Sequence, residues 1–127
     1  MKLYTDIKQS KRLSEILPLN SADLLYYCNK ENPALISEKP FVRTFEETNS
    51  LFSYIPCWSL NELMTILWIN YDLYPLFEND NNWRICMCSR KAGSDKVNYL
   101  NDTATTNKDL LDCCVELIEK LYKLKLL

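Results

Sequence analysis

Residues 56–64 read Pro56-Cys57-Trp58-Ser59-Leu60-Asn61-Glu62-Leu63-Met64, and this stretch predicts the start of a central helix. Ser59 and Glu62 have the spacing of a capping box, in which the Ser59 hydroxyl accepts from the Glu62 amide and the Glu62 carboxylate accepts from the Ser59 amide. Trp58 stands five residues before Leu63, where a hydrophobic staple would place it. An aromatic residue therefore sets the angle at which the chain enters the helix. The motif is evidence for a fold and points to no chemistry.

A hydrophobic stripe continues this helix. Its members recur at the spacing of one face at 3.6 residues per turn, and they are Leu60, Leu63, Met64, Leu67 and Trp68. Pro75 ends the helix at the latest. Thr5 is the expected cap of an earlier helix that stops before Pro18. A third apolar face lies near the C-terminal end of the chain, so we predict helices near residues 5–17, 60–74 and 108–124.

Strand signals are clearest in the second half of the chain. Residues 83–89 alternate between two faces and predict a strand, and residues 97–100 would pair back on it as a hairpin. Residues 101–107 are rich in helix-cap formers and read as a polar connection. Residues 24–28 form a compact apolar run that fits a short helix or a strand equally well, because periodicity does not separate the two.

These elements predict an α+β fold. We expect a small antiparallel sheet, with a hairpin near residues 83–100, packed by about three helices. A chain of 127 residues has the usual length of one domain, so the prediction is a single globular domain over residues 1–127.

The lack of histidine and the near lack of glycine restrict the kinds of catalytic and phosphate-binding site that the chain can form. The chain has no histidine and one glycine, Gly93. Loops that cradle phosphate need several glycines at fixed offsets, which excludes a P-loop and a dinucleotide fingerprint. Histidine is the commonest general base and the usual partner of a serine or cysteine nucleophile. The composition therefore argues against an enzyme, with carboxylate or lysine chemistry left open, and we predict no catalytic residue and no cofactor.

The six cysteines indicate a cytoplasmic protein with reduced thiols. The first residues lack the apolar run of a signal peptide, and the longest apolar segment is too short and too polar to span a bilayer. A metal site would draw on Cys86, Cys88, Cys113 and Cys114, but the paired C-x(2–4)-C spacing of structural zinc sites is missing. The favoured interpretation is that these cysteines are small buried apolar residues.

Aromatic residues are more numerous than a small core requires. Tyr71 and Tyr74 lie in one stripe near the end of the central helix, and Trp83 begins the predicted strand. Exposed tyrosine and tryptophan carry binding energy at modest entropic cost, so these three residues are candidates for a protein interface. The alternative for each is ordinary packing in the core or at its rim.

A basic stripe on the first helix supports a different hypothesis. Lys8, Lys11 and Arg12 share one face and could contact phosphates. The formal net charge is −2, and nucleic-acid-binding domains usually carry a basic excess. A solvated helix surface is the favoured interpretation of this stripe.

Three segments also carry a resemblance to known sequences. They are residues 9–18 with the following Ser21-Ala22-Asp23, residues 56–60, and Asp112-Cys113-Cys114-Val115-Glu116. In these segments the chain resembles short uncharacterised proteins of Bacteroides-type bacteria and their phages or mobile elements. The resemblance implies such a setting, and it carries over no activity and no site.

The favoured functional hypothesis is a small soluble, non-enzymatic protein that interacts with another protein, such as an accessory protein of a phage or mobile element. A nucleic-acid-associated protein is the alternative. Self-association into a homo-oligomer is compatible with the first hypothesis, and no membrane partner is expected.

Overall fold

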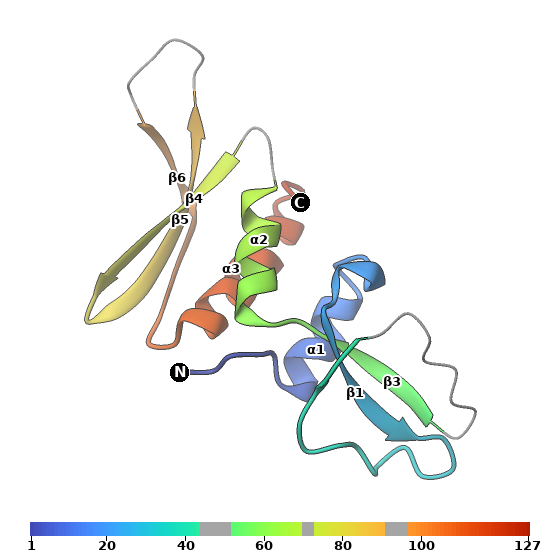
Figure 1. Ribbon diagram of the computed structural model, residues 1–127. Helices are drawn as coiled ribbons and strands as arrows, with labels where there is room; N and C mark the ends of the chain where they lie inside the picture. The colour runs from blue at the N-terminus through green and yellow to red at the C-terminus, as the bar shows by residue number, and fades with distance from the viewer. Residues whose placement is uncertain (44–51, 70–72, 91–96) are drawn as a thin grey trace. The chain divides into compact units, whose positions relative to one another are not determined.

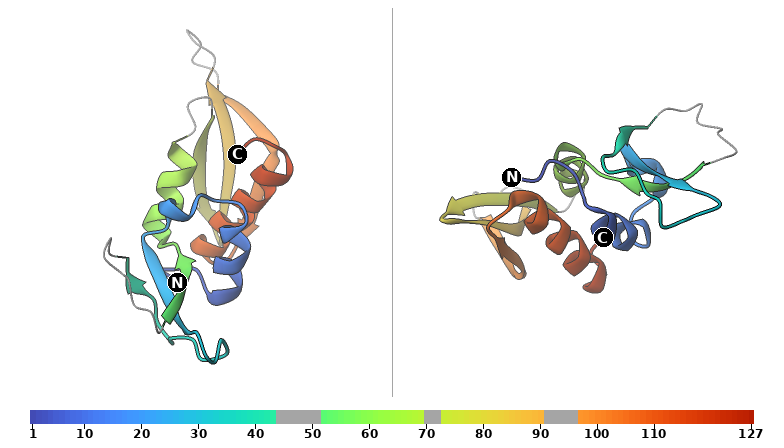
Figure 2. Two further views of the ribbon diagram at one scale, coloured as in Figure 1. Left: turned by 90° about the vertical axis from the view of Figure 1, so that its right-hand side faces the viewer. Right: turned by 90° about the horizontal axis from the view of Figure 1, so that it is seen from below.

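The computed structural model describes residues 1–43, 52–69, 73–90 and 97–127 (Figure 1). The elements in chain order are α1 (Ile7–Ser14), the short 3-10 helix η1 (Leu19–Ser21), β1 (Leu24–Asn29), β2 (Phe41–Val42), β3 (Phe52–Cys57), α2 (Leu60–Trp68), β4 (Leu73–Asp80), β5 (Asn82–Arg90), β6 (Val97–Asn107) and α3 (Leu110–Lys123). The strands form two antiparallel three-stranded sheets, ordered β2-β1-β3 and β4-β5-β6 (Figures 1 and 2). The predicted α+β class is confirmed, with three α-helices in the described residues and two small sheets where one was expected.

The chain divides into two compact units, which we describe separately. The N-terminal unit comprises Tyr4–Glu62, and the C-terminal unit comprises Leu63–Leu127 together with Met1–Leu3. Each unit contains one of the two sheets. The single-domain expectation for the whole chain stays a prediction.

The C-terminal unit contains the predicted hairpin. β5 and β6 pair antiparallel from Trp83 opposite Asn107 to Arg90 opposite Val97, which confirms the hairpin near residues 83–100. β4 pairs with the other side of β5. Residues 91–96, in which Gly93-Ser94-Asp95 predict the turn of the hairpin, lie outside the described residues.

The predicted end of the central helix is wrong. The helix expected to reach residue 74 stops at Trp68, and Leu73 and Tyr74 belong to β4. Pro75, which the sequence suggested as a helix terminator, lies within β4. β4 is at the edge of the β4-β5-β6 sheet. An edge strand tolerates a residue without an amide proton, because half of its amides have no strand to pair with.

The expected polar connection over residues 101–107 is also wrong, because these residues belong to β6. Threonine is β-branched and fits a pleated sheet well, so the threonines there favour a strand as much as a helix cap. Thr103 and Thr105 are buried within this strand.

A wide irregularity interrupts the pairing of β5 with β6. Ile85 faces Thr105 and Met87 faces Leu100, so residues 101–104 form a bulge opposite Cys86. The Thr103 hydroxyl fixes the bulge: its oxygen accepts from the Met87 amide at 2.9 Å and its proton is donated to the Leu100 carbonyl at 2.6 Å. Bulges of this kind redirect side chains at sheet edges and next to binding sites.

The core of the C-terminal unit lies between α3 and the strands β5 and β6, which α3 contacts. The predicted apolar face of α3 is confirmed, and its buried residues are Leu110, Leu111, Cys113, Cys114, Val115, Leu117, Ile118 and Leu121. The apolar pattern of residues 108–124 also places Leu124 at the flank of this face, but Leu124 is exposed because it follows the last residue of α3. β5 contributes four consecutive buried residues, Ile85 to Cys88, so both of its faces are covered.

In the N-terminal unit, the undecided run at residues 24–28 is a strand. β1 pairs with β3 from Leu24 opposite Cys57 to Asn29 opposite Phe52, and it also pairs with the two-residue strand β2. Residues 34–37 also have a strand-like sequence, and within them Ile36 forms an isolated bridge to Cys28.

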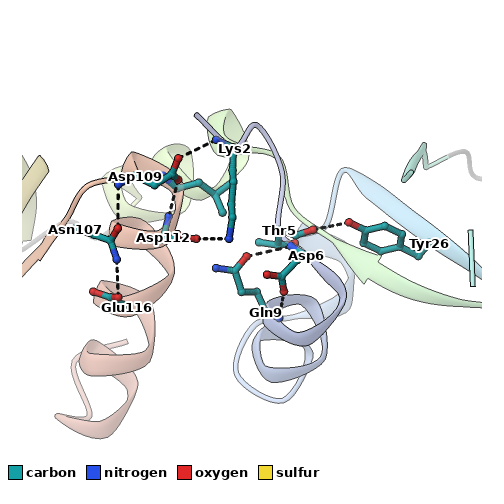
Figure 3. Close-up of polar contacts among 10 residues, drawn as sticks. Lys2, Thr5, Asp6, Gln9, Tyr26, Asn107, Asp109, Asp112 and Glu116 are labelled. Atoms are coloured by element: carbon teal, nitrogen blue, oxygen red, sulfur yellow. Dashed lines mark hydrogen bonds and ion pairs between the residues drawn. The ribbon is translucent and has the colours of Figure 1, made fainter. Parts of the chain in front are cut away.

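The first helix has a different cap from the one expected. Asp6, not Thr5, is the N-cap, and it forms a complete capping box with Gln9 (Figure 3). The Gln9 amide donates to Asp6 Oδ1 at 2.8 Å, and the Asp6 amide donates to Gln9 Oε1 at 3.0 Å. Thr5 is instead buried, with its hydroxyl 2.7 Å from the Ser10 hydroxyl.

The motif at Ser59 is half confirmed. The Glu62 amide donates to Ser59 Oγ at 3.1 Å, as a capping box requires. The Ser59 amide donates to Asp23 Oδ1 at 2.8 Å, so a carboxylate distant in sequence takes the position expected for Glu62. Trp58 is fully buried, and its indole nitrogen donates to Ser21 Oγ at 3.0 Å. The start of α2 is thus connected to residues 21–23 by hydrogen bonds.

Candidate functional site

An exposed aromatic patch in the C-terminal unit is the strongest candidate for a functional surface. It consists of Trp68, Ile69 and Tyr74, and we call it the aromatic patch. Trp68 ends α2 with 54% of its surface exposed, and Ile69 follows with 62% exposed. The rings of Trp68 and Tyr74 stack with centroids 6.4 Å apart and planes inclined by 23°. The stacking brings the end of α2 and the start of β4 together into one surface.

The local sequence explains how the patch is placed. The Ile69 amide donates to the Ile66 carbonyl at 3.3 Å, which adds a tight final turn after α2. Tyr74 is fixed in β4 opposite Cys88 of β5. The backbone hydrogen bonds at the end of α2 and the pairing of β4 with β5 therefore fix the positions of the two rings.

The three residues predicted as a protein interface have different outcomes. Tyr74 is half-buried within the aromatic patch. Trp83 is half-buried in β5 opposite Asn79, about 17 Å of strand from the position opposite Tyr74. Tyr71 lies outside the described residues. The structure therefore does not bring Trp83 to the patch.

Sequence reasoning missed Trp68 and Ile69 as surface residues. Both fit the apolar stripe of the central helix and were expected in its core. Periodicity identifies the face of a helix but does not show how far along that face other residues cover it. The polar residue Asn70 directly after Ile69 is the one sequence signal that the covered part of the helix ends there.

The basic stripe of the N-terminal unit is exposed as required for contact with a ligand. Lys8, Lys11 and Arg12 are all exposed on α1. Lys11 and Arg12 occupy the last turn of this helix, where positive charge is favourable near the unpaired carbonyls. That structural role accounts for two of the three basic residues without any ligand.

The strand cysteines considered as metal ligands have protein partners. The Cys86 thiol donates to the Leu100 carbonyl at 3.4 Å, and the Cys88 thiol donates to the Cys86 carbonyl at 3.8 Å. Burial raises the pKa of the Cys88 thiol. A protonated thiol is a poor metal ligand and a poor nucleophile.

The helix cysteines are in a similar environment. The Cys113 thiol donates to the Thr105 carbonyl at 3.4 Å. Burial raises the pKa of Cys113, although a hydrogen bond with Thr105 partly opposes this, and burial raises the pKa of Cys114 to about 12. All six cysteines of the chain are buried and free of disulfides. Within the described residues, no three His, Cys, Asp or Glu side chains are grouped so that they could hold a metal ion.

The carboxylate of Asp109 in the C-terminal unit has a structural role. Asp109 is the N-cap of α3, and its side chain accepts from the amides of Leu111 and Asp112 and from the Lys2 amide at 2.9 Å (Figure 3). The Lys2 ammonium forms an ion pair with Asp112 at 2.9 Å. Burial tends to raise the Asp109 pKa, but the three backbone amides outweigh it and hold the pKa below its usual value. This environment favours the ionised form, which is unsuited to a general acid.

Comparison of the chain with family models, with curated proteins and with solved structures finds no match. Across the described part of the chain, none of the helices combines the length and the apolar character needed to cross a membrane.

Proposed function

We propose that this protein is a non-enzymatic protein-interaction or accessory protein that binds its partner through the aromatic patch. The observation that supports this function is the exposure of Trp68 and Ile69 beside the ring of Tyr74. The setting we propose is the cytoplasm of a Bacteroides-type bacterium that carries a phage or mobile element, on the basis of the three similar segments.

The exposed rings of the aromatic patch would gain free energy when a partner removes them from water. Burying apolar surface contributes roughly 25 cal/mol per Å², and a tryptophan is among the largest apolar side chains. Tryptophan and tyrosine dominate measured hot spots, because they bring a large contact area with few rotatable bonds. A partner that covers Trp68 and Ile69 would therefore gain most of its affinity at two adjacent residues.

The test compares patch variants with a matched control. Trp68→Ala and Ile69→Ser remove apolar surface from the patch. Tyr122→Ala removes a comparably exposed aromatic residue from α3. All four proteins, including the unmodified chain, are used as bait in host-cell extract, with circular dichroism to confirm folding. We expect one protein to be retained by the unmodified chain and by Tyr122→Ala, and lost with Trp68→Ala and Ile69→Ser.

Sedimentation of the purified chain separates a foreign partner from a second copy. A monomer–dimer equilibrium abolished by Trp68→Ala would identify the partner as another copy of this chain. If every variant retains the same proteins as the unmodified chain and none changes in sedimentation, the aromatic patch is not a binding surface.

We also propose, as a second candidate, association with nucleic acid through α1. The supporting observation is the simultaneous exposure of Lys8, Lys11 and Arg12 on that helix. Phosphate contacts made by such residues release counterions, so the affinity must fall as salt increases.

Fluorescence anisotropy with a labelled single strand and a labelled duplex tests this second candidate. The triple variant Lys8→Gln/Lys11→Gln/Arg12→Gln should weaken binding and flatten its dependence on salt. Lys123→Gln/Lys125→Gln in the C-terminal unit is the control for loss of positive charge. Binding that responds equally to both variants would indicate general charge attraction and would remove α1 as the site.

A further inference from the structure

A pocket beside the bulge of β6 lies apart from the aromatic patch and has no role in the proposed function. It has a volume of about 400 Å³, and its described lining residues are Tyr99, Leu100, Asn101, Asp102, Thr103, Leu124 and Leu126. Binding sites for small molecules typically measure roughly 300–1,000 Å³ and combine apolar walls with a few polar groups. The pocket has both properties.

One wall of the pocket is the bulge itself. Thr103 is buried, and its hydroxyl connects the Met87 amide with the Leu100 carbonyl. The Lys120 ammonium donates to the Ala104 carbonyl at 2.7 Å and fixes the other end of the bulge to α3. The bulge is therefore held at both ends, and its shape does not depend on a ligand.

The opposite wall is formed by the turn that ends α3. The Lys125 amide donates to the Tyr122 carbonyl at 3.1 Å, and the Leu126 amide donates to the Leu121 carbonyl at 2.9 Å. This pair of bonds is a Schellman motif, which places Leu124 and Leu126 on either side of Lys125. Lys125 has φ = 57°, a conformation that glycine adopts more readily than lysine. The left-handed residue is the normal feature of this helix end, and it fixes the position of the two leucines in the wall.

Exposed apolar side chains surround the pocket. Tyr99, Leu124 and Leu126 all line it and are all exposed. Single exposed leucines are common on protein surfaces. Exposed apolar side chains gathered around a pocket are instead typical of a binding site for the apolar part of a ligand. The rim therefore indicates a ligand with an apolar body.

The charge of the residues that line the pocket indicates which polar group the ligand carries. Asp102 carries the one charge at neutral pH among the described lining residues, and it is exposed at the bulge. A carboxylate accepts hydrogen bonds most strongly from a charged donor. We propose that this pocket binds a small amphipathic amine, whose apolar body lies against Leu124 and Leu126 and whose ammonium group is bound by Asp102.

The experiment is a titration of the full-length, isotope-labelled chain followed by amide NMR shifts. The probes are benzylamine, benzyl alcohol and benzoate, which share a ring and differ in the head group. Ligands of this size reach dissociation constants on the order of 1 mM. We expect saturable shifts at residues 99–103 and 124–126 with benzylamine, several-fold weaker binding of benzyl alcohol, and no saturation with benzoate.

Variants at the pocket make the assignment specific. Asp102→Asn should weaken benzylamine by about three- to tenfold and leave benzyl alcohol unchanged, since a partly exposed ion pair has a limited contribution. Leu124→Gln should weaken both ligands. Asp80→Asn, an exposed carboxylate on β4, is the control and should change neither. Benzoate binding as tightly as benzylamine, an unchanged benzylamine affinity in Asp102→Asn, or no saturable shift at the pocket would each overturn the proposal.

Discussion

The interior of the N-terminal unit and the interior of the C-terminal unit contain different kinds of interaction. In the N-terminal unit, a hydrogen-bonded polar network is buried beside the apolar side chains: the Tyr26 hydroxyl donates to the Thr5 carbonyl at 2.7 Å, and the Thr5 hydroxyl lies 2.7 Å from Ser10 Oγ and accepts from the Trp58 amide at 3.2 Å. Burial raises the pKa of the Tyr26 phenol, so it remains protonated and able to donate. In the C-terminal unit, the buried face of α3 consists of apolar and cysteine side chains.

The difference predicts which substitutions each unit tolerates. An apolar core depends on volume, and a truncated side chain costs its transfer free energy plus that of the cavity left behind. A buried polar network depends on matched donors and acceptors, and losing one member leaves the others without partners. One substitution in each unit tests this comparison, and smaller effects are expected at a helix cap and at a left-handed residue of the C-terminal unit.

The largest effect on stability is expected in the apolar core of the C-terminal unit. Leu117 is fully buried on α3, so Leu117→Ala should lower the free energy of unfolding by about 2–5 kcal/mol. Urea denaturation followed by circular dichroism measures the change, and Tyr122→Ala on the exposed face is the control. A loss below about 0.5 kcal/mol would show that Leu117 is not part of the core.

The buried polar network of the N-terminal unit is tested at Thr5, which is completely buried. Thr5→Val keeps the volume but removes the hydroxyl that Ser10 and the Trp58 amide use, at a cost of about 1–3 kcal/mol. Thr5→Ser retains the hydroxyl and should recover most of the loss, whereas Thr106→Val at an exposed position of β6 should have little effect. If Thr5→Ser is as unstable as Thr5→Val, the methyl group matters and not the hydrogen bonds, and the contrast between the units disappears.

A smaller, pH-dependent effect is expected at the cap of α3. The pKa of Asp109 is lowered in the folded protein, so the unfolded chain binds more protons in acid and the stabilisation is lost as the pH falls below about 4. The contribution should stay under about 1 kcal/mol because the group is close to solvent. Unfolding curves between pH 3 and 7 measure it as a difference between the unmodified chain and Asp109→Asn. An equal pH dependence in both proteins would show that other groups are responsible.

The smallest effect is a gain in stability. Lys125 has φ = 57°, so Lys125→Gly should relieve the strain and stabilise the protein by about 0.5–1 kcal/mol. Lys123→Gly, two residues earlier within α3, should instead destabilise it by about 1 kcal/mol. Thermal unfolding of the two variants shows the opposite signs directly. A loss of stability in Lys125→Gly would mean that the lysine side chain contributes more than its backbone strain costs.

Elements with a strong local pattern could be predicted from the sequence. α3 repeats its apolar positions over four turns and begins with a good cap, and β5 alternates over its whole length, so both were located correctly. β4 was missed because its apolar residues begin only a few positions after those of α2, and Pro75 was interpreted as a helix end. Whether such a proline ends a helix or lies in an edge strand depends on the neighbouring strand, which a local pattern does not contain.

The candidate site was also only partly predictable, because its residues come together through contacts that a local sequence pattern does not contain. Tyr74 could be selected by composition, but its stacking on Trp68 depends on the meeting of a helix end with a strand. The pocket beside β6 was not expected at all, since residues 101–104 form a wall only because the register of β5 and β6 shifts there. The Asp6–Gln9 capping box, in contrast, was readable from spacing alone and was overlooked because Thr5 was chosen as the cap.

The burial of every cysteine gives the protein a set of built-in chemical reporters. A thiol-alkylating reagent reaches such a residue only when the surrounding structure opens, so the rate of modification measures the free energy of local opening. Cys28 and Cys57 report on the N-terminal unit, and Cys86, Cys88, Cys113 and Cys114 report on the C-terminal unit. Peptide mass analysis after timed alkylation would therefore compare the opening of the two units in one sample, with no label introduced by mutation.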